Sequence, residues 1–386
     1  MGDIDIKETD IKETDLHNDY PEAFLTLLRD HSRFHVFKEQ HPELSKKELS
    51  AHDLDPENLI IWATDDYAKP EVEGYSFKDP ITVEKIVGDN GMIIQPRCKK
   101  TAEEQTRRAK DKAEVFTPSW VCNAQNNLVD DAWFGRKNIF NSEVVDENGK
   151  HTWITNTEPI TEVPEGKTWK DYVKDTRMEI TCGEAPYLAS RYDATTGEYI
   201  PTSNRIGLLD RKLRLISENC DKSDKWLDMA KVAYHNIYGF EWQGDNLLLA
   251  RESLLLTFME FYFDKFKKNP PIKSIDSIAY IISWNIWQMD GLLFVIPNSC
   301  HDYEKVTKIQ ASLFEEAKEI RETCHCEGCQ NKDNNKHNGI YAVIRDWDKH
   351  SQTKKRKDGT CGRDECDMRF IDFLNEQKKN NNTSAI

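Results

Sequence analysis

The sequence has little positive charge for its size, and it lacks the short motifs of several large enzyme classes. It contains 53 Lys and Arg against 68 Asp and Glu, which gives a formal net charge of −15. Such a charge opposes non-specific binding of nucleic acid over the whole surface, so any contact with DNA needs local basic clusters. No Walker A loop, GxSxG elbow, HExxH pair or PD-(D/E)xK signature occurs. NTPase, hydrolase and nuclease functions therefore have no support.

Long apolar runs are also missing. No stretch of about 18 apolar residues exists, which predicts that no transmembrane helix forms. The N-terminal segment MGDIDIKETDIKETD is acidic and has no apolar centre, so it is not expected to be a secretory signal. Ten Cys without an export signal indicate reduced thiols that pack or bind metal. We therefore expect a cytoplasmic protein with no membrane partner.

Composition and hydrophobic spacing divide the chain into four stretches. We expect a flexible acidic leader at 1–16, a mostly helical region at 17–112, a core at 113–300, and a Cys-rich stretch with a last core strand at 301–386. Between residues 178 and 260 the order strand, turn, helix, strand, helix predicts a βαβ unit and a parallel sheet. The predicted fold class is therefore α/β.

Shorter elements are predicted from local patterns. The apolar run Leu59–Ala63 favours a strand, and the charged segment at 303–323 favours a helix. The apolar residues from Met368 to Leu374 are typical of a further strand.

Three segments carry candidate site residues, in a fixed order along the chain. EVFTP at 114–118 precedes a predicted helix, EITCGEAPYL at 179–188 runs from a strand into a turn, and IYGFE at 237–241 is a strand that ends in an acid. Small residues at the end of the first strand of a doubly wound sheet let a ligand approach the backbone, and an acid after the next strand accepts ribose hydroxyls. The order favours a nucleotide-type ligand. An ordinary strand-to-helix turn is the alternative explanation of the single glycine.

These segments resemble a known family. AEVFTPSWVCN, EITCGEAPYLASRYD, NIYGFEWQGDNLLLAR and IISWNIWQMDGL, in this order, are similar to N6-adenine DNA methyltransferases of the permuted class, in which the FTP motif precedes the glycine motif. The match looks closest to proteins called restriction endonuclease subunit M and covers roughly residues 90–350. The resemblance implies a methyltransferase-type doubly wound, mostly parallel sheet, S-adenosylmethionine as cofactor, and DNA as substrate in a restriction–modification system.

By this resemblance, the FTP segment, the glycine turn and the end of the next strand would surround S-adenosylmethionine. The implied cofactor-binding residues are Phe116, Thr117, Pro118, Glu179, Thr181, Cys182, Gly183, Glu184, Pro186, Tyr187 and Glu241. The FTP residues would line the methionine and adenosine side, the turn would lie under the cofactor, and Glu241 would hold its ribose. Asp346 resembles the later acidic motif that meets the cofactor adenine, and Asp290 is the alternative for that role.

The family's catalytic tetrapeptide, (N/D)-P-P-(Y/F/W), is not found. Its amide and a backbone carbonyl accept hydrogen bonds from the target amine, and its aromatic ring stacks on the flipped base. The predicted strand at 368–374 is followed by NEQKK. The segment NPPI at 269–272 has no aromatic residue, and a Pro pair there is typical of a helix end. Trp284 and Trp287 either stack a base or are buried sheet aromatics, so no catalytic residue is assigned.

A cysteine cluster predicts a metal site of its own. Cys326 and Cys329 form a CxxC pair, and Cys361 and Cys366 form a looser second pair. Four thiolates suit a structural Zn²⁺ in tetrahedral geometry and leave no open position for catalysis. The alternative is a set of reduced free thiols.

Two basic clusters are candidate DNA contacts. One includes Arg107 and Arg108, and the other is Lys354, Lys355, Arg356 and Lys357, between the two cysteine pairs. A solvated charged loop is the alternative.

The favoured function is that of an S-adenosylmethionine-dependent adenine-N6 DNA methyltransferase, a modification subunit or a homologue, whose catalytic motif comes from a partner chain or a diverged segment. The alternative is a catalytically inactive binding or assembly subunit, or an anti-restriction factor. An RNA or protein methyltransferase is a third reading, since a cofactor pocket does not name its substrate.

Overall fold

The computed structural model describes residues 13–112, 114, 117–309, 318–347 and 367–383. The N-terminal region begins with four helices, α1 (Glu13–Asp19), α2 (Pro21–Leu27), α3 (His31–Gln40) and α4 (Lys46–Ala51). Ser45 caps α4 in a capping box with Glu48, which satisfies backbone N–H groups at the helix start. Helices are therefore confirmed for the first part of this region.

The stretch from 52 to 101 is less helical than expected. It contains α5 (Val83–Ile86) and the single-turn 3₁₀ helices η1 (Pro56–Asn58), η2 (Gly88–Asn90) and η3 (Arg97–Lys99), before α6 (Ala102–Lys112). The apolar run at 59–63 is buried, but it takes part only in isolated bridges, Leu59 with Arg29 and Ile61 with Pro80. Its neighbours are loops rather than strands, so the expected strand is not formed.

The centre of the chain is a parallel sheet of three strands. β3 (Arg177–Ile180), β4 (Ile237–Glu241) and β5 (Ile286–Gln288) lie in the order β3-β4-β5. The 3₁₀ turn η4 (Thr202–Asn204) and the helices α9 (Leu208–Asn219) and α10 (Ser223–His235) connect the first two strands, and α11 (Gly244–Phe266) and α12 (Ile272–Asn285) connect the last two. This is the βαβ arrangement predicted from the sequence. Among the described residues the parallel sheet stops at three strands, so the class α/β holds but the larger doubly wound sheet is not seen.

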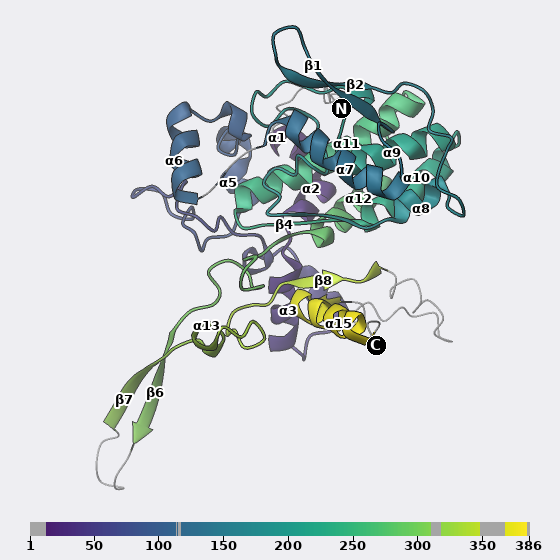
Figure 1. Ribbon diagram of the computed structural model, residues 1–386. Helices are drawn as coiled ribbons and strands as arrows, with labels where there is room; N and C mark the ends of the chain where they lie inside the picture. Colours follow the sequence, from purple (N-terminus) through teal and green to yellow (C-terminus); the bar gives the residue numbers. More distant parts are fainter. Residues whose placement is uncertain (1–12, 113, 115–116, 310–317, 348–366, 384–386) are drawn as a thin grey trace.

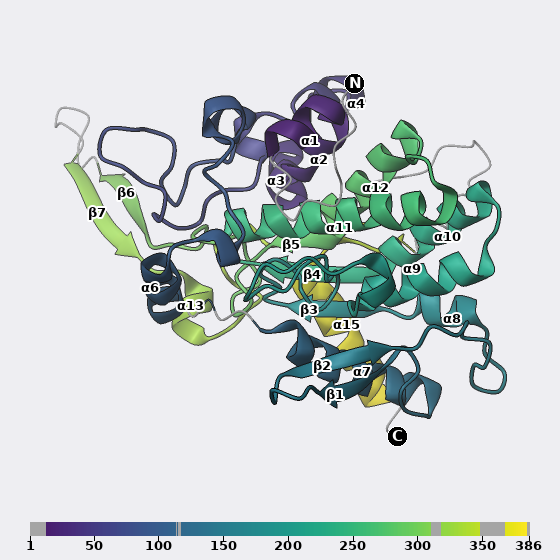
Figure 2. The same cartoon turned by 90° about the horizontal axis from the view of Figure 1, so that it is seen from above.

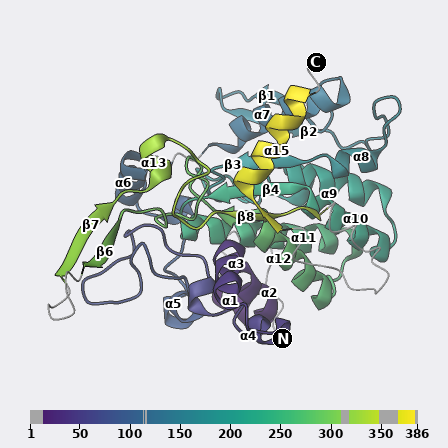
Figure 3. The same cartoon turned by 90° about the horizontal axis from the view of Figure 1, so that it is seen from below.

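Both faces of the sheet are covered, because the side chains along each strand point alternately to the two faces and are apolar on both. Ile237 and Ile286 belong to the main core with α11, α12 and α2. Phe240 and Trp287 point to the opposite face and pack with Phe370 of the last helix. Figure 2 shows the helical layer along one side of β3–β5, and Figure 3 shows the last helix, α15 (Phe370–Thr383), crossing the other.

A smaller unit packs beside this core. It consists of α7 (Ser119–Phe134), the antiparallel pair β1 (Asn141–Val145) and β2 (His151–Thr155), and α8 (Trp169–Lys174). Its own apolar cluster includes Phe134, Phe140 and Tyr172. Figure 2 shows the β1–β2 pair beside α7.

The C-terminal stretch differs from two expectations. Strands β6 (Tyr303–Ile309) and β7 (Lys318–Cys324) form an antiparallel hairpin that projects from the body in Figure 1, where a charged helix was predicted. β8 (Val343–Arg345) pairs with β9 (Asp367–Arg369), and the helix α15 begins directly at Phe370. The predicted last core strand at 368–374 is therefore wrong: β9 is antiparallel and outside the parallel sheet. Alternating charged and β-branched residues suit a two-stranded ribbon as well as a helix, which explains the first error.

One more helix, α13 (Glu327–Asn331), follows the hairpin. Within the described ranges no helix is both long enough and apolar enough to cross a membrane.

Candidate functional site

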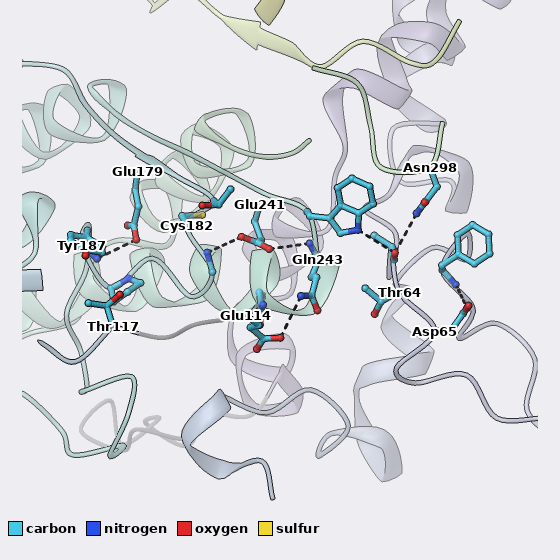
Figure 4. Close-up of a pocket in the computed structure, with 17 residues that line it drawn as sticks. Thr64, Asp65, Glu114, Thr117, Glu179, Cys182, Tyr187, Glu241, Gln243 and Asn298 are labelled. Atoms are coloured by element: carbon cyan, nitrogen blue, oxygen red, sulfur yellow. Dashed lines mark hydrogen bonds between the residues drawn. The ribbon is translucent and has the colours of Figure 1, made fainter. Parts of the chain in front are cut away.

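A cavity of about 720 Å³ opens at the carboxyl ends of β3 and β4. Ligands of open α/β sheets bind at this edge, because the backbone turns away there and leaves a crevice. Figure 4 shows its walls, which come from the N-terminal region, the glycine turn, the start of α11 and the segment after β5. Its lining residues are Ala63, Thr64, Asp65, Phe77, Glu114, Thr117, Glu179, Thr181, Cys182, Gly183, Pro186, Tyr187, Glu241, Trp242, Gln243, Asn246 and Asn298.

The turn after β3 forms one side of the cavity. Thr181, Gly183 and Ala185 have φ angles of 48°, 54° and 60°, in the left-handed region. Such angles are strained in residues other than glycine, and strain of this kind gathers at ligand sites. Glu179 holds the turn: its buried carboxylate accepts the backbone N–H of Leu188 at 3.2 Å. Burial raises the pKa of Glu179 well above its usual value.

Glu241 lies at the end of β4 and faces the same turn. Its Oε2 accepts the N–H of Gly183 at 2.9 Å, and its Oε1 accepts the N–H of Gln243 at 3.2 Å. The side chain is 7% exposed, and burial raises its pKa to about 7 in spite of the two hydrogen bonds, which lower it. Glu241 therefore links the two strand ends and keeps lone pairs for hydroxyl donors of a ligand.

Buried ion pairs support the floor of the cavity. Arg108 contacts Glu114 at 2.5 Å and Asp245 at 2.7 Å, and Lys100 contacts Asp245 at 3.2 Å. Arg108 is 3% exposed, which disfavours the interpretation of this residue as a DNA contact. Its guanidinium is taken up by carboxylates of the protein itself, because a buried charge must be paired.

Two lining residues present acceptors that have no protein partner. Oε1 of Glu114 and Oδ1 of Asn246 are buried and make no hydrogen bond in the structure. A buried acceptor without a donor is unfavourable by about 1–3 kcal/mol.

The far wall of the cavity comes from segments that the motifs do not include. Ala63 has a φ of 62°, and its carbonyl accepts Nε1 of Trp242 and Nδ2 of Asn298, both at 3.3 Å. Asp65 accepts the N–H of Phe77 at 2.8 Å. The only sequence signal for this wall was an apolar run followed by Thr64 and Asp65. Such a run does not by itself indicate a ligand site.

Most of the residues implied by the resemblance gather at this cavity. Those among its lining residues are Thr117, Glu179, Thr181, Cys182, Gly183, Pro186, Tyr187 and Glu241. Pro118, Glu184, Asp290 and Asp346 are not among them. Phe116 lies outside the described residues. The cavity is completed by Glu114, Gln243 and Asn246, which lie within the resembling segments but were not assigned a role, and by Asp65, Phe77 and Asn298, which lie outside them.

Two of the acids away from the cavity have structural partners. Glu184 accepts the N–H of Arg97 at 2.7 Å and the hydroxyl of Tyr192 at 2.5 Å. Asp290 accepts the N–H of Leu292 at 2.8 Å and so closes a turn after β5.

The NPPI segment marks a helix boundary. Lys267 ends α11 in the left-handed conformation, and Pro271 is the residue before α12. Trp284 and Trp287 are buried, at 5% and 4% exposure. Trp284 stacks on His31 with ring centroids 3.8 Å apart. Both residues are therefore buried aromatics, but only Trp287 lies in the sheet, in β5, whereas Trp284 lies in α12.

A second group of side chains can hold a metal ion. Cys300, Cys326, Cys329 and His337 bring their ligand atoms within 4.8 Å of one another. Sγ of Cys300 lies 3.2 Å from Sγ of Cys326 and 3.4 Å from Sγ of Cys329, and Nδ1 of His337 lies 3.5 Å from Sγ of Cys300. Three sulfurs and one nitrogen at these separations can surround a single tetrahedral ion.

This group contains half of the predicted zinc ligands. Cys326 and Cys329 belong to it, whereas Cys361 and Cys366 lie outside the described residues. Cys300 and His337 complete the group. The sequence signals were a CxxC pair, a histidine shortly after it and a single cysteine before the hairpin. Cys300 has no neighbouring ligand in the sequence, and only the hairpin brings it close to the CxxC pair.

The two basic clusters differ in what the structure describes. Arg107 is exposed and forms an ion pair with Asp66 at 2.5 Å. Lys354, Lys355, Arg356 and Lys357 lie outside the described residues.

No protein-family model, curated protein or solved structure matches this chain.

Proposed function

We propose that this chain binds S-adenosylmethionine and belongs to an adenine-N6 DNA methyltransferase of a restriction–modification system, as a modification subunit or homologue. The observation that supports the proposal is the cavity itself. Residues of three sequence segments that resemble cofactor motifs, Thr117, the turn at 181–183 and Glu241, line one cavity at the carboxyl ends of parallel strands.

Each part of the cavity suits one part of this cofactor. Glu241 offers carboxylate oxygens to ribose hydroxyls, and Glu114 and Asn246 add polar side chains to the lining. The turn at 181–183 lets a ligand lie close to the backbone. When bound, S-adenosylmethionine supplies a methyl group on a cationic sulfur, and this chain would hold and orient it for in-line transfer to the exocyclic nitrogen of adenine.

The residues that accept the target amine would come from a partner chain or a diverged segment. The catalytic tetrapeptide is missing from the sequence, and the NPPI segment lies between two helices rather than at the cavity. The same observation, with the net charge of −15, favours the alternative of an inactive binding or assembly subunit.

Calorimetry with S-adenosylmethionine tests the cavity. Glu241→Gln removes one charge at the ribose position, and we expect its affinity to fall about tenfold to a hundredfold, since hydrogen bonds to charged groups contribute about 1.5–3 kcal/mol. Glu147→Gln, at an exposed position away from the cavity, is the matched control and should bind as the parent does. No binding at millimolar cofactor would refute the cofactor proposal.

Methyl transfer separates the two functions. Tritiated methyl incorporation into unmethylated DNA is measured with the chain alone and with the products of neighbouring genes. Incorporation that needs a neighbouring product supports a subunit, and cofactor binding with no incorporation in any mixture supports the inactive alternative.

We also propose that the ion held by the Cys300 group is a structural Zn²⁺. Thiolate and imidazole donors suit zinc, and four protein ligands leave no position for a reactive water. Elemental analysis should find about one equivalent per chain. Cys329→Ser should lose it, and Cys324→Ser, at a cysteine outside the group, should keep it.

A further inference from the structure

The metal-ligand group is connected directly to one wall of the cavity. Cys300 follows Asn298, a lining residue, by two positions. Figure 4 shows Asn298 at the edge of the cavity, reaching the chain beside Thr64. Cys300 and Cys326 also flank the β6–β7 hairpin, so the group lies at the base of that hairpin.

The wall segment has little regular structure to hold it. Phe294 has a φ angle of 60°, which is unfavourable for a bulky residue, and Asn298 has the same angle, which Asn tolerates better than most residues. Ile296 packs against Ile61 and Ala63, and hydrogen bonds join the wall to the segment at 340–342. Ile296 donates its N–H to the carbonyl of Ile340 at 2.7 Å, and Ile340 donates to Oγ of Ser299 at 3.0 Å. Ala342 donates to the carbonyl of Phe294 at 3.0 Å.

Both of these segments lead to metal ligands. Cys300 ends the first, and His337 precedes the second by three residues. Gly339 packs against Cys300, where an added Cβ would lie 2.8 Å from the backbone nitrogen of Cys300. A metal bound by Cys300 and His337 therefore closes the open end of this short ladder of hydrogen bonds.

A cross-link between distant residues stabilises the local fold by restricting the open state. Without the metal, the wall keeps the packing of the buried Val295 and Ile296, but its more exposed end at 298–300 depends on a few hydrogen bonds, and segments with few buried contacts open at the lowest free energy. The carbonyl of Ala63 would then lose Asn298 as a donor, because that contact depends on the position of the wall.

We propose that the metal bound by Cys300, Cys326, Cys329 and His337 holds the Asn298 wall of the cavity in place, so that metal and cavity ligand bind with positive coupling. Asn298 is a positioning residue that depends on the metal. By linkage, metal release lowers the affinity for the ligand, and ligand binding raises the affinity for the metal by the same factor, about 5-fold to 150-fold. The choice of S-adenosylmethionine as the probe rests on the proposed function, whereas the effect on the wall does not.

Hydrogen exchange tests the wall without any cofactor. The full chain is compared loaded with zinc and after removal of zinc by a chelator. We expect peptides covering 294–300 and 337–342 to exchange at least tenfold faster without zinc, and peptides of α11, in the core, to be unchanged. Equal exchange of the wall in the two forms would overturn the proposal.

Variants connect this effect to the cavity. Cys329→Ser should lose zinc and bind S-adenosylmethionine about tenfold more weakly. Cys329→His restores a zinc donor and should recover both properties. Cys324→Ser should retain both. Asn298→Ala should keep zinc but lower the affinity for the cofactor. This variant distinguishes the effect of the wall from the effect of metal binding.

The outcomes also separate this inference from the proposed function. If the zinc-loaded chain does not bind S-adenosylmethionine, the proposed function fails, and hydrogen exchange still decides the role of the metal. If the cofactor binds equally with and without zinc, the proposed function survives and the coupling is refuted.

Discussion

Glu241 connects the two strands that carry the cavity, and its environment sets its chemistry. Burial holds its pKa at about 7, and backbone N–H groups of Gly183 and Gln243 stabilise its ionised form. Ribose hydroxyls donate more strongly to a carboxylate than to a neutral acid. A ligand that donates hydroxyls should therefore bind better once Glu241 is ionised.

This predicts a pH dependence of cofactor affinity. With a pKa of about 7, the ionised fraction of Glu241 rises about tenfold between pH 6 and pH 8, and affinity should rise with it. Calorimetry at both pH values measures the change. Glu241→Gln removes the titrating group, so any pH dependence that remains in this variant comes from other groups, including those of the cofactor. An equal pH dependence in the parent and the variant would contradict the prediction.

The same pKa predicts an effect on stability. Because the folded pKa of Glu241 lies above its unfolded value, its protonated form stabilises the fold below about pH 4.5, and this contribution is lost as pH rises through about 7. In the absence of ligand, Glu241→Gln should therefore be more stable than the parent at pH 8, by up to about 3 kcal/mol. Urea unfolding at pH 5 and pH 8 measures the difference, and a variant less stable than the parent at pH 8 would refute it.

At the scale of elements, α11 organises the core. Most of its surface is buried, so it packs against β4 and β5, α9 and α12 rather than presenting one polar face to solvent. Its Arg251 is 1% exposed and donates to the carbonyls of Ile286, Arg29, Ser283 and Leu27. One side chain thus joins α11 to β5, α12 and the N-terminal helices.

Arg251→Met should therefore destabilise the fold strongly. The substitution keeps an unbranched apolar side chain but removes the guanidinium and leaves several buried carbonyls without donors, each unfavourable by about 1–3 kcal/mol. We expect a loss of about 3 kcal/mol or more in the free energy of unfolding, measured with urea. Arg136→Met removes an exposed ion pair with Glu162 and is the matched control, with an expected change below about 1 kcal/mol. Equal effects of the two substitutions would show that Arg251 does not join these elements.

At the scale of the whole molecule, charge limits what the chain can do alone. The net charge is −15, and Arg108, one of the candidate DNA contacts, is paired inside the protein. Phosphate contacts provide most of the affinity of non-specific DNA binding. These features favour weak binding of duplex DNA by the chain alone.

We predict that the isolated chain binds a short duplex no more tightly than about 10 μM at physiological salt, the range of non-specific binding. Fluorescence anisotropy with a labelled duplex measures this. Arg107→Ala should change little, because its charge is paired with Asp66. Nanomolar binding by the chain alone would contradict the prediction and would favour an independent DNA-binding function.

The sequence by itself determined the local features of this protein. The order of β3, α10, β4 and α11, the acid at the end of β4, the turn after β3 and the CxxC pair were all predicted from periodicity and short motifs. Such features depend on neighbouring residues, whose spacing the sequence states directly.

Tertiary structure decided which distant groups meet. It brought Ala63, Asp65 and Asn298 to the cavity, added Cys300 and His337 to the CxxC pair, and buried Arg108. It also made a hairpin of the segment expected to be a helix and ended the last strand at Arg369. Each of these outcomes depends on contacts between residues far apart in the chain. A single sequence does not record them, because side-chain pairing and burial are set by the partner that packing supplies.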